Sequence, residues 1–110
     1  MTRRGRGQRA VRWTDRAKRD LVQIGDYIAT NNPSAAESWV QALLDRAERA
    51  ASSPFAARRV PEIGRDDVRE VFLRTYRLVY RILDQSIDVL TVFEGHRLLP
   101  AEVIDQLSDE

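Results

Sequence analysis

The stretch from Tyr76 to Pro100, YRLVYRILDQSIDVLTVFEGHRLLP, decides the fold that this sequence predicts. Residues 76–83 and 87–94 are rich in β-branched and aromatic side chains, which favour strands. The polar residues 84–86 between them are typical of a turn. The stretch therefore predicts two neighbouring antiparallel strands.

Three arginines interrupt the apolar residues of this stretch. Side chains alternate between the two faces of a strand, so Arg77 and Arg81 fall opposite Tyr76 and Leu78. We expect this pair to lie on a solvated face of the sheet. Depending on register, the same surface gains the further arginines Arg69, Arg74 and Arg97.

The residues before this stretch predict one short strand and two helices. The strand is 10–13, and Thr14 is a good N-cap for a helix that runs to about residue 31. Asn32 caps a second helix, which has Pro33 in its first turn and ends near Ser52. Because the link between these two helices is so short, we expect them to form an antiparallel helical hairpin.

A third strand over 68–74 and a short helix over 100–107 complete the pattern. The order is β-α-α-β-β-β followed by a short C-terminal helix, which is an α+β fold. We expect an antiparallel sheet of about four strands, with the helical hairpin on one face. The other face should be open or only partly covered.

The composition fits one domain with two charged ends. The chain has 110 residues and no cysteine, so disulfides and thiolate metal sites are excluded. Residues 1–13 carry a charge of +5 and residues 101–110 a charge of −4, while the part between them is nearly neutral. We interpret 1–9 as a disordered basic tail and 98–110 as a short helix with an acidic end. No apolar run is long enough to span a bilayer, and a cytoplasmic protein is the simplest interpretation.

Four segments between about residues 10 and 100 together resemble a known protein superfamily, and the domain assigned on this basis spans 10–97. The segments that carry the resemblance are DLVQIGDYI in the first helix, PSAA at the start of the second, VPE before the sheet, and YRLVYRILDQSIDVLTV in the strand pair. In their order and spacing they are similar to the RelE/ParE superfamily of type II toxin–antitoxin systems. The long hairpin and the YRLVYRI context look closer to ParE and plasmid-stabilisation proteins than to RelE.

The resemblance implies a small toxin that a cognate antitoxin neutralises. ParE-like members inhibit DNA gyrase, whereas RelE-like members are ribosome-dependent mRNA interferases. Because one fold carries both activities, the residues must decide between them. A third interpretation is a binding module that poisons nothing, which predicts no growth defect when the protein is expressed alone.

An endoribonuclease of this kind needs proton-transfer groups and cations around the scissile phosphate. The candidates here are Glu62, Arg74, Arg81 and His96. His96 is the only histidine, and Lys18, the only lysine, lies in the first helix. Six acidic residues also dilute the arginines of the sheet region, which argues against specific nucleic-acid binding. We therefore favour a toxin that acts by binding, with no catalytic residue, cofactor or metal.

An antitoxin segment that folds on contact needs an apolar trough with charged edges. Aromatic and apolar side chains off the core stripes supply candidates for the trough, and arginines supply candidates for its edges. The candidate partner-binding residues are Trp13, Tyr27, Trp39, Leu44, Arg69, Arg77, Arg81 and Arg97. An edge strand of the sheet is a further docking site for the same partner.

Overall fold

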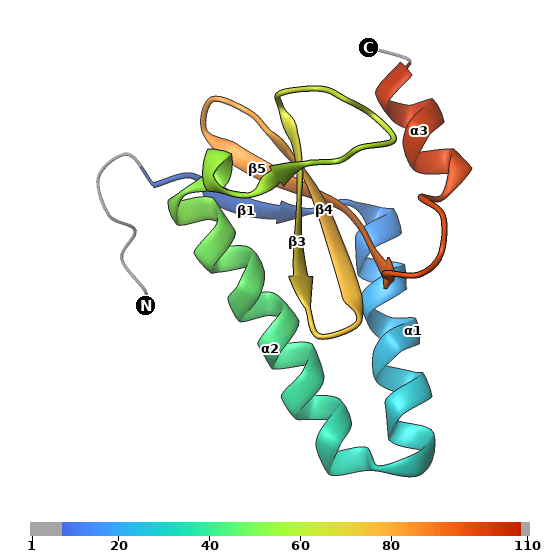
Figure 1. The fold of residues 1–110 in the computed structure, drawn as a ribbon. Helices are drawn as coiled ribbons and strands as arrows, with labels where there is room; N and C mark the ends of the chain where they lie inside the picture. The colour runs from blue at the N-terminus through green and yellow to red at the C-terminus, as the bar shows by residue number, and fades with distance from the viewer. Residues whose placement is uncertain (1–7, 109–110) are drawn as a thin grey trace.

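The structure, a computed structural model, describes residues 8–108. Figure 1 shows a twisted sheet with the helical hairpin against one face and a short helix beside the other. The sheet has five strands in the order β1-β5-β4-β3-β2. The elements are β1 (Ala10–Trp13), α1 (Asp15–Asn31), α2 (Pro33–Ser52), the 3₁₀ turn η1 (Pro54–Ala56), β2 (Arg58–Arg59), β3 (Val68–Leu73), β4 (Tyr76–Ile82), β5 (Ser86–Glu94) and α3 (Ala101–Ser108).

The α+β fold and its element order are confirmed, and the sheet has two features that the sequence did not predict. The two-residue strand β2 pairs with β3 through Arg58 opposite Glu70 and Arg59 opposite Arg69. At the other edge, β1 runs parallel to β5, from Ala10 opposite Ser86 onward, so the sheet is mixed. The other three strand pairs are antiparallel.

The helical hairpin begins and ends at the capping residues that the sequence indicates. Thr14 Oγ1 accepts a hydrogen bond from the N–H of Ala17 at the start of α1. Asn32 closes α1 by donating its backbone N–H to Ile28, and its side chain accepts from the N–H of Ala35 to open α2. Caps of this kind each stabilise a helix by about 1 kcal/mol.

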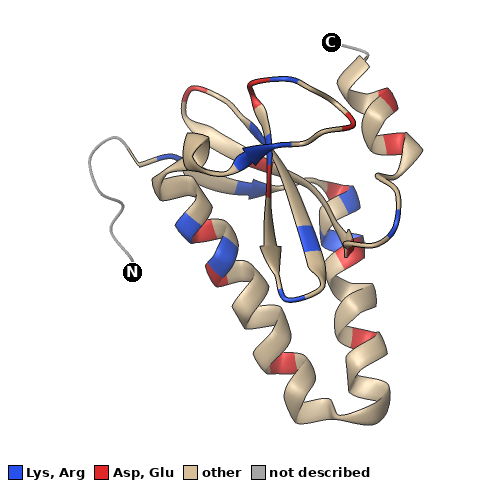
Figure 2. Cartoon of the chain, viewed as in Figure 1, with Lys and Arg blue, Asp and Glu red and all other residues tan. Residues whose placement is uncertain are grey.

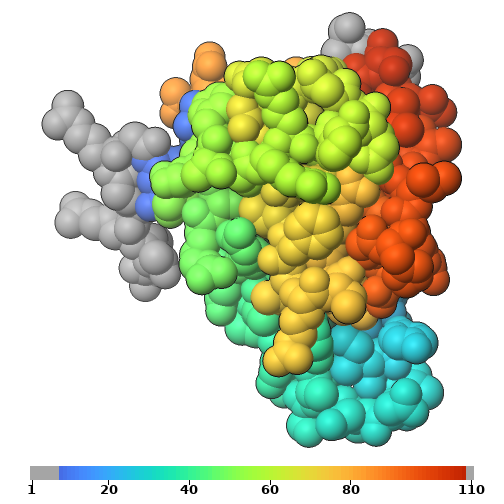
Figure 3. All heavy atoms as spheres, viewed as in Figure 1, coloured from blue at the N-terminus to red at the C-terminus, as the bar shows by residue number. Residues whose placement is uncertain are grey.

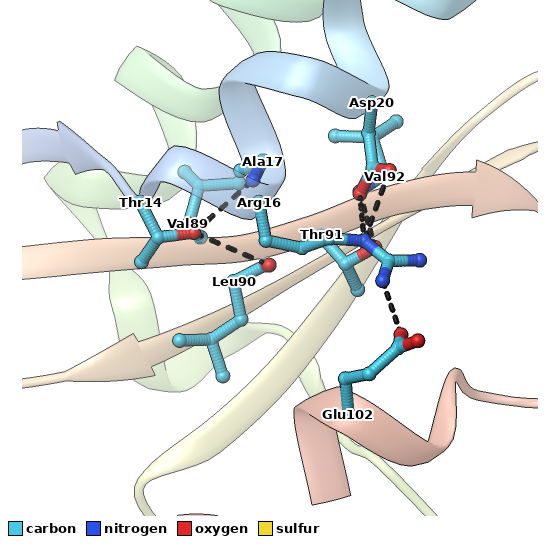
Figure 4. A network of polar contacts seen from close by, with 9 residues as sticks. All are labelled: Thr14, Arg16, Ala17, Asp20, Val89, Leu90, Thr91, Val92 and Glu102. Carbon is cyan, nitrogen blue, oxygen red and sulfur yellow. Dashed lines mark hydrogen bonds and ion pairs between the residues drawn. The ribbon is translucent and has the colours of Figure 1, made fainter. Parts of the chain in front are cut away.

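Side-chain contacts fix α1 to strand β5 of the sheet (Figure 4). The hydroxyl of Thr14 lies 3.0 Å from the carbonyl oxygen of Val89 in β5. Six residues further on, Asp20 Oδ2 accepts hydrogen bonds from Thr91 Oγ1 at 2.5 Å and from the N–H of Val92 at 3.3 Å. Arg16 pairs with Asp20 at 3.1 Å and also with Glu102 at the start of α3. One turn of α1 thus contacts both β5 and α3.

Apolar residues fill both sides of the sheet. Between the hairpin and the sheet, Leu43 and Ala47 of α2 pack against Leu78 and Tyr80 of β4. The opposite face is covered as well, contrary to the expectation that it would be open or only partly covered. There, α3 and the segment before β3 bury a second cluster made of Val60, Val68, Val79, Leu90, Leu99, Val103 and Leu107.

Both ends of the described chain contact the sheet domain. Val103 and Leu107 of α3 pack on the sheet, while Ile104 remains 37% exposed. Most of the proposed basic tail, residues 1–7, lies outside the described residues. Its last arginine, Arg9, donates a hydrogen bond to the carbonyl oxygen of Leu83 at 2.7 Å.

Among residues 8–108, no helix combines the length and the apolar character that crossing a membrane requires.

Candidate partner-binding surfaces

Arg77 is the residue for which the structure corrects the sequence interpretation most clearly. Instead of lying on a solvated face, it is 5% exposed. Its Nε and Nη2 donate to Glu70 Oε1 at 2.9 and 2.5 Å, and its Nη1 and Nη2 donate to the two carboxylate oxygens of Glu62 at 2.9 and 2.7 Å. The guanidinium carbon of Arg77 also lies 5.4 Å from the centre of the Phe93 ring. Arg77 is thus a structural residue without a free guanidinium to offer an antitoxin.

The contact with Arg77 changes the pKa of Glu62. The hydrogen bonds from Arg77 lower the pKa of Glu62 to about 2. The hydrogen bonds that Arg77 donates to Glu62 in turn raise the pKa of Arg77. Glu70 has a side chain with no exposed area and also accepts from Arg58 Nε at 2.6 Å. A carboxyl group with so low a pKa is a weak general base at neutral pH.

The four residues of the nuclease alternative have separate partners. Glu62 binds Arg77, as described, and Arg81 pairs with Asp67, with Nε 3.4 Å from Oδ2. Arg74 lies in the turn between β3 and β4 with φ of 52°, and its guanidinium covers the ring of Trp39 at 5.4 Å. His96 is exposed and has its Nδ1 3.9 Å from Glu94.

Two of the partner-binding candidates, Tyr27 and Arg97, line one cleft of about 530 Å³ between α1 and the residues that follow β5. Tyr27 is 71% exposed, and the neighbouring Leu98 is 87% exposed. Within residues 8–108, Arg97 forms no ion pair. The floor of this cleft includes Asp20 and Arg16, whose contacts are drawn in Figure 4.

A second, smaller hollow of about 230 Å³ lies between α2 and the end of β3. Trp39 and Ala42 line it from α2, and Leu73 and Arg74 line it from the sheet. The Trp39 ring meets the edge of Tyr76 at 5.5 Å, so one side of this tryptophan belongs to the core and the other faces the hollow.

The remaining candidates contribute less open surface. Trp13 is half-buried against the main core, and Leu44 is half-buried on α2. Arg69 is committed within the protein, because it donates to the carbonyl oxygen of Ala57 at 2.8 Å and pairs with Asp66 at 2.7 Å. The structure therefore does not gather the eight candidates into one groove.

Sequence reasoning missed a basic stripe on α2. Trp39, Ala42, Arg46 and Arg49 follow the spacing of one helical face, and this spacing was readable in the sequence. Among the described residues, neither Arg46 nor Arg49 forms an ion pair. Burial and the neighbouring Arg49 lower the pKa of Arg46. Figure 2 shows the basic segments of α2, of β2 and of the β3–β4 turn in blue.

The element order and the hairpin-on-sheet arrangement define an α+β domain of the RelE/ParE-like class. The family model described as "ParE toxin of type II toxin-antitoxin system, parDE" matches residues 11–99. This chain therefore belongs to the ParE toxin family of type II toxin–antitoxin systems.

Two individual proteins are similar to the chain. A protein of Sinorhizobium fredii (strain NBRC 101917 / NGR234), named "Putative toxin Y4kP", is 33% identical over 96 residues, which cover 84% of this chain and 95% of that protein. The solved structure titled "Chromosomal ParDE TA system from P. aeruginosa" matches with a TM-score of 0.70. It is 22% identical and covers 80% of this chain and 97% of its own, which is a likeness of fold.

Proposed function

We propose that this ParE-family toxin inhibits DNA gyrase by binding it, and that a cognate antitoxin neutralises the toxin. The main observation in favour of a binding mechanism is that Arg77 is buried and ion-paired. This arginine is buried against Glu62 and Glu70, so it is neutralised instead of being presented to a phosphate. A phosphoryl-transfer site would need such a cation free to stabilise the charge of the transition state.

The low pKa of Glu62 supports the same choice. A carboxylate with a pKa of about 2 has little tendency to take a proton from a ribose hydroxyl near pH 7. His96, the only histidine, lies exposed beside Glu94, and none of its recorded contacts is with Glu62, Arg74 or Arg81. The mRNA interferase therefore remains the second candidate, and a separate assay tests it.

The decisive experiment is a supercoiling assay with purified toxin, relaxed plasmid, ATP and gyrase. We expect loss of supercoiling as the toxin is titrated above the gyrase concentration. Relaxation of plasmid by a type I topoisomerase, under the same conditions, is the matched control and should be unchanged. Full gyrase turnover at excess toxin would refute the proposal. Transcript cleavage in a translating extract, lost on substitution of His96 or Arg81, would favour the interferase instead.

The proposed antitoxin docks on the exposed hollows of the toxin in the cytoplasm, where gyrase works. The cleft at Tyr27 and Arg97 and the hollow at Trp39 both offer apolar surface beside an arginine without an ion pair. Such surfaces suit a partner segment with apolar anchors and carboxylates. Co-expression with the neighbouring gene, followed by isolation of a complex, tests this part of the proposal.

A further inference from the structure

Arginines from separate parts of the chain gather around the 3₁₀ turn η1, which follows the end of α2. Phe55 of this turn is 50% exposed. The guanidinium of Arg9 lies 5.8 Å from the centre of its ring, and that of Arg69 lies 5.3 Å from it. In Figure 3 the green atoms around η1 lie beside the blue atoms of the first described residues. One aromatic side chain thus holds two cations that are far apart in the sequence.

Two further arginines reach the same place from α2. The hydroxyl of Tyr80 donates to the carbonyl oxygen of Pro54 in η1 at 2.6 Å. Burial raises the pKa of Tyr80, whereas the charges of Arg69 and Arg46 lower it, so both guanidiniums lie near this hydroxyl. Arg49 follows Arg46 on the same face of α2. We define the η1 patch as Arg9, Arg46, Arg49, Phe55 and Arg69.

The positive charge of the η1 patch is only partly balanced. Within residues 8–108, Arg9, Arg46 and Arg49 form no ion pair. Arg69 pairs with Asp66 at 2.7 Å, and an arginine of β2 shares that carboxylate. Residues 1–7 lie outside the described chain, and their sequence adds three arginines and no acid directly before it. The patch therefore has cations to offer to an anionic partner.

The η1 patch suits a partner that brings charge and needs no apolar anchor. None of its residues lines the cleft at Tyr27 or the hollow at Trp39. An acidic protein segment gains affinity from apolar anchors and backbone pairing, which those hollows suit better. A nucleic-acid backbone, in contrast, binds through its phosphates. All cations of the patch are arginines, whose planar guanidinium can donate two parallel hydrogen bonds to one phosphate.

A double strand fits the η1 patch better than a single strand does. Proteins that hold single strands present aromatic rings on which the bases stack. The recorded ring contacts of Phe55 are instead with Arg9 and Arg69, so this ring positions cations. Contacts to phosphates carry no sequence information. The binding that this patch supports is therefore independent of the base sequence.

We propose that the η1 patch binds the phosphate backbone of duplex DNA. Arg9, Arg46 and Arg49 contact phosphates, and Phe55 keeps the guanidiniums of Arg9 and Arg69 in place. The choice of DNA rests on the proposed function, because gyrase acts on duplex DNA. A toxin that is held on the DNA meets gyrase at a raised local concentration.

Fluorescence anisotropy of a short labelled duplex of mixed sequence, titrated with purified full-length toxin at several salt concentrations, tests the proposal. We expect the logarithm of the association constant to fall linearly with the logarithm of the salt concentration. The double variant Arg46→Gln, Arg49→Gln should make this slope shallower by about two, which is about one for each arginine. Phe55→Ala should weaken binding without changing the slope, because it removes no charge.

The matched control for these variants is Arg19→Gln, which removes the same charge from another exposed position. Arg19 lies on the same side of α1 as Gln23, which lines the cleft at Tyr27 and no part of the η1 patch. This variant should bind the duplex with unchanged affinity and slope. An equal change of slope in Arg19→Gln, or no binding of wild-type toxin at low salt, would refute the proposal.

Further arms of the experiment distinguish other partners. Removal of residues 1–7 should reduce affinity but leave a slope that still depends on Arg46 and Arg49. If this removal abolishes binding, the N-terminal segment alone binds DNA and the η1 patch does not. Equal displacement of the duplex by polyglutamate, or tighter binding of a single-stranded RNA, would also overturn the proposal.

A folding control keeps the result interpretable. Circular dichroism compares the double variant with the wild type, and Arg49→Gln alone, at an exposed position, should still change the slope by about one. DNA binding by a toxin that leaves gyrase unimpaired would refute only the proposed target. Gyrase inhibition by a toxin that does not bind the duplex would refute only the proposed role of the η1 patch.

Discussion

Arg77 Nη2 lies 2.5 Å from Glu70 Oε1, inside a sheet face where the Glu70 side chain has no exposed area. The two residues come from the neighbouring strands β4 and β3. Burial of either charge alone would destabilise the folded protein, so each residue needs the other as its counter-ion. This mutual dependence gives the first prediction.

Removal of one residue of this ion pair should destabilise the protein far more than removal of both. Arg77→Met leaves Glu70 buried with only Arg58, and we expect the free energy of unfolding to fall by about 3–5 kcal/mol. The double variant Arg77→Met, Glu70→Leu should recover part of this loss, because no unpaired charge remains buried. Urea denaturation measures both effects. A loss below about 1 kcal/mol in the single variant would contradict the assignment of a buried ion pair.

The pKa of Glu62 gives a pH dependence with a defined sign. Arg77 lowers this pKa from 4.5 to about 2 in the folded protein. A carboxyl group whose pKa is lower in the folded than in the unfolded protein stabilises the folded state. This stabilisation is complete at pH values above the unfolded-state pKa, and it is lost as the pH falls to the folded-state pKa. We expect stability to decline between about pH 4.5 and 2, and Glu62→Gln to show a shallower decline there. Parallel curves for wild type and variant, from unfolding midpoints against pH, would disprove the pairing.

The contact between Asp20 and Thr91 should be important for docking of α1. Asp20→Ala removes the acceptor for the Thr91 hydroxyl and for the N–H of Val92, both of which are buried. Loss of a buried acceptor costs about 1–3 kcal/mol in free energy of unfolding. Asp26→Ala, which removes an exposed acid from the interior of the same helix, is the matched control and should change stability little. Equal effects of the two substitutions would contradict this role.

The apolar face of helix α3 should contribute more to the free energy of unfolding than the ion pair between Glu102 and Arg16 does. Val103 is 1% exposed, and Val103→Ala should lower the free energy of unfolding by about 1.5–3 kcal/mol. Glu102, which pairs with Arg16 at the surface, has a side chain that is 75% exposed. Glu102→Gln should therefore cost less than about 1 kcal/mol. The reverse order of the two effects in thermal or urea unfolding would show that the ion pair dominates.

The sequence predicted those parts of the fold that short-range signals determine. Thr14 and Asn32 mark the ends of the helices through hydrogen bonds within three residues, and such bonds leave a local pattern. The two residues of β2 leave none, because only their pairing with β3 makes them a strand. The parallel partner of β1 is likewise hidden, since Ala10 and Ser86 are far apart in the chain.

The candidate site was harder to predict for the same reason. Alternation correctly separated Arg77 from Leu78, but it could not reveal that Glu62 and Glu70 would enclose the arginine. Their contacts depend on how the segment before β3 folds over the sheet. The basic residues Arg46 and Arg49 on α2 were visible in the sequence, whereas the hollow between Trp39 and Leu73 on the same helix depends on how α2 packs on the sheet.

The parallel pairing of β1 with β5 also determines when the toxin can fold during its synthesis. Thr14 and Val89, which meet at the end of this pairing, are separated by 75 positions. Among the described strands, β1 pairs only with β5. Strand β1 therefore cannot pair until the ribosome has translated Glu94 and β5 has emerged. A prematurely terminated chain lacks the pairing of β1 with β5 and exposes the apolar side of its helical hairpin. Translation that stops early should thus yield no folded toxin.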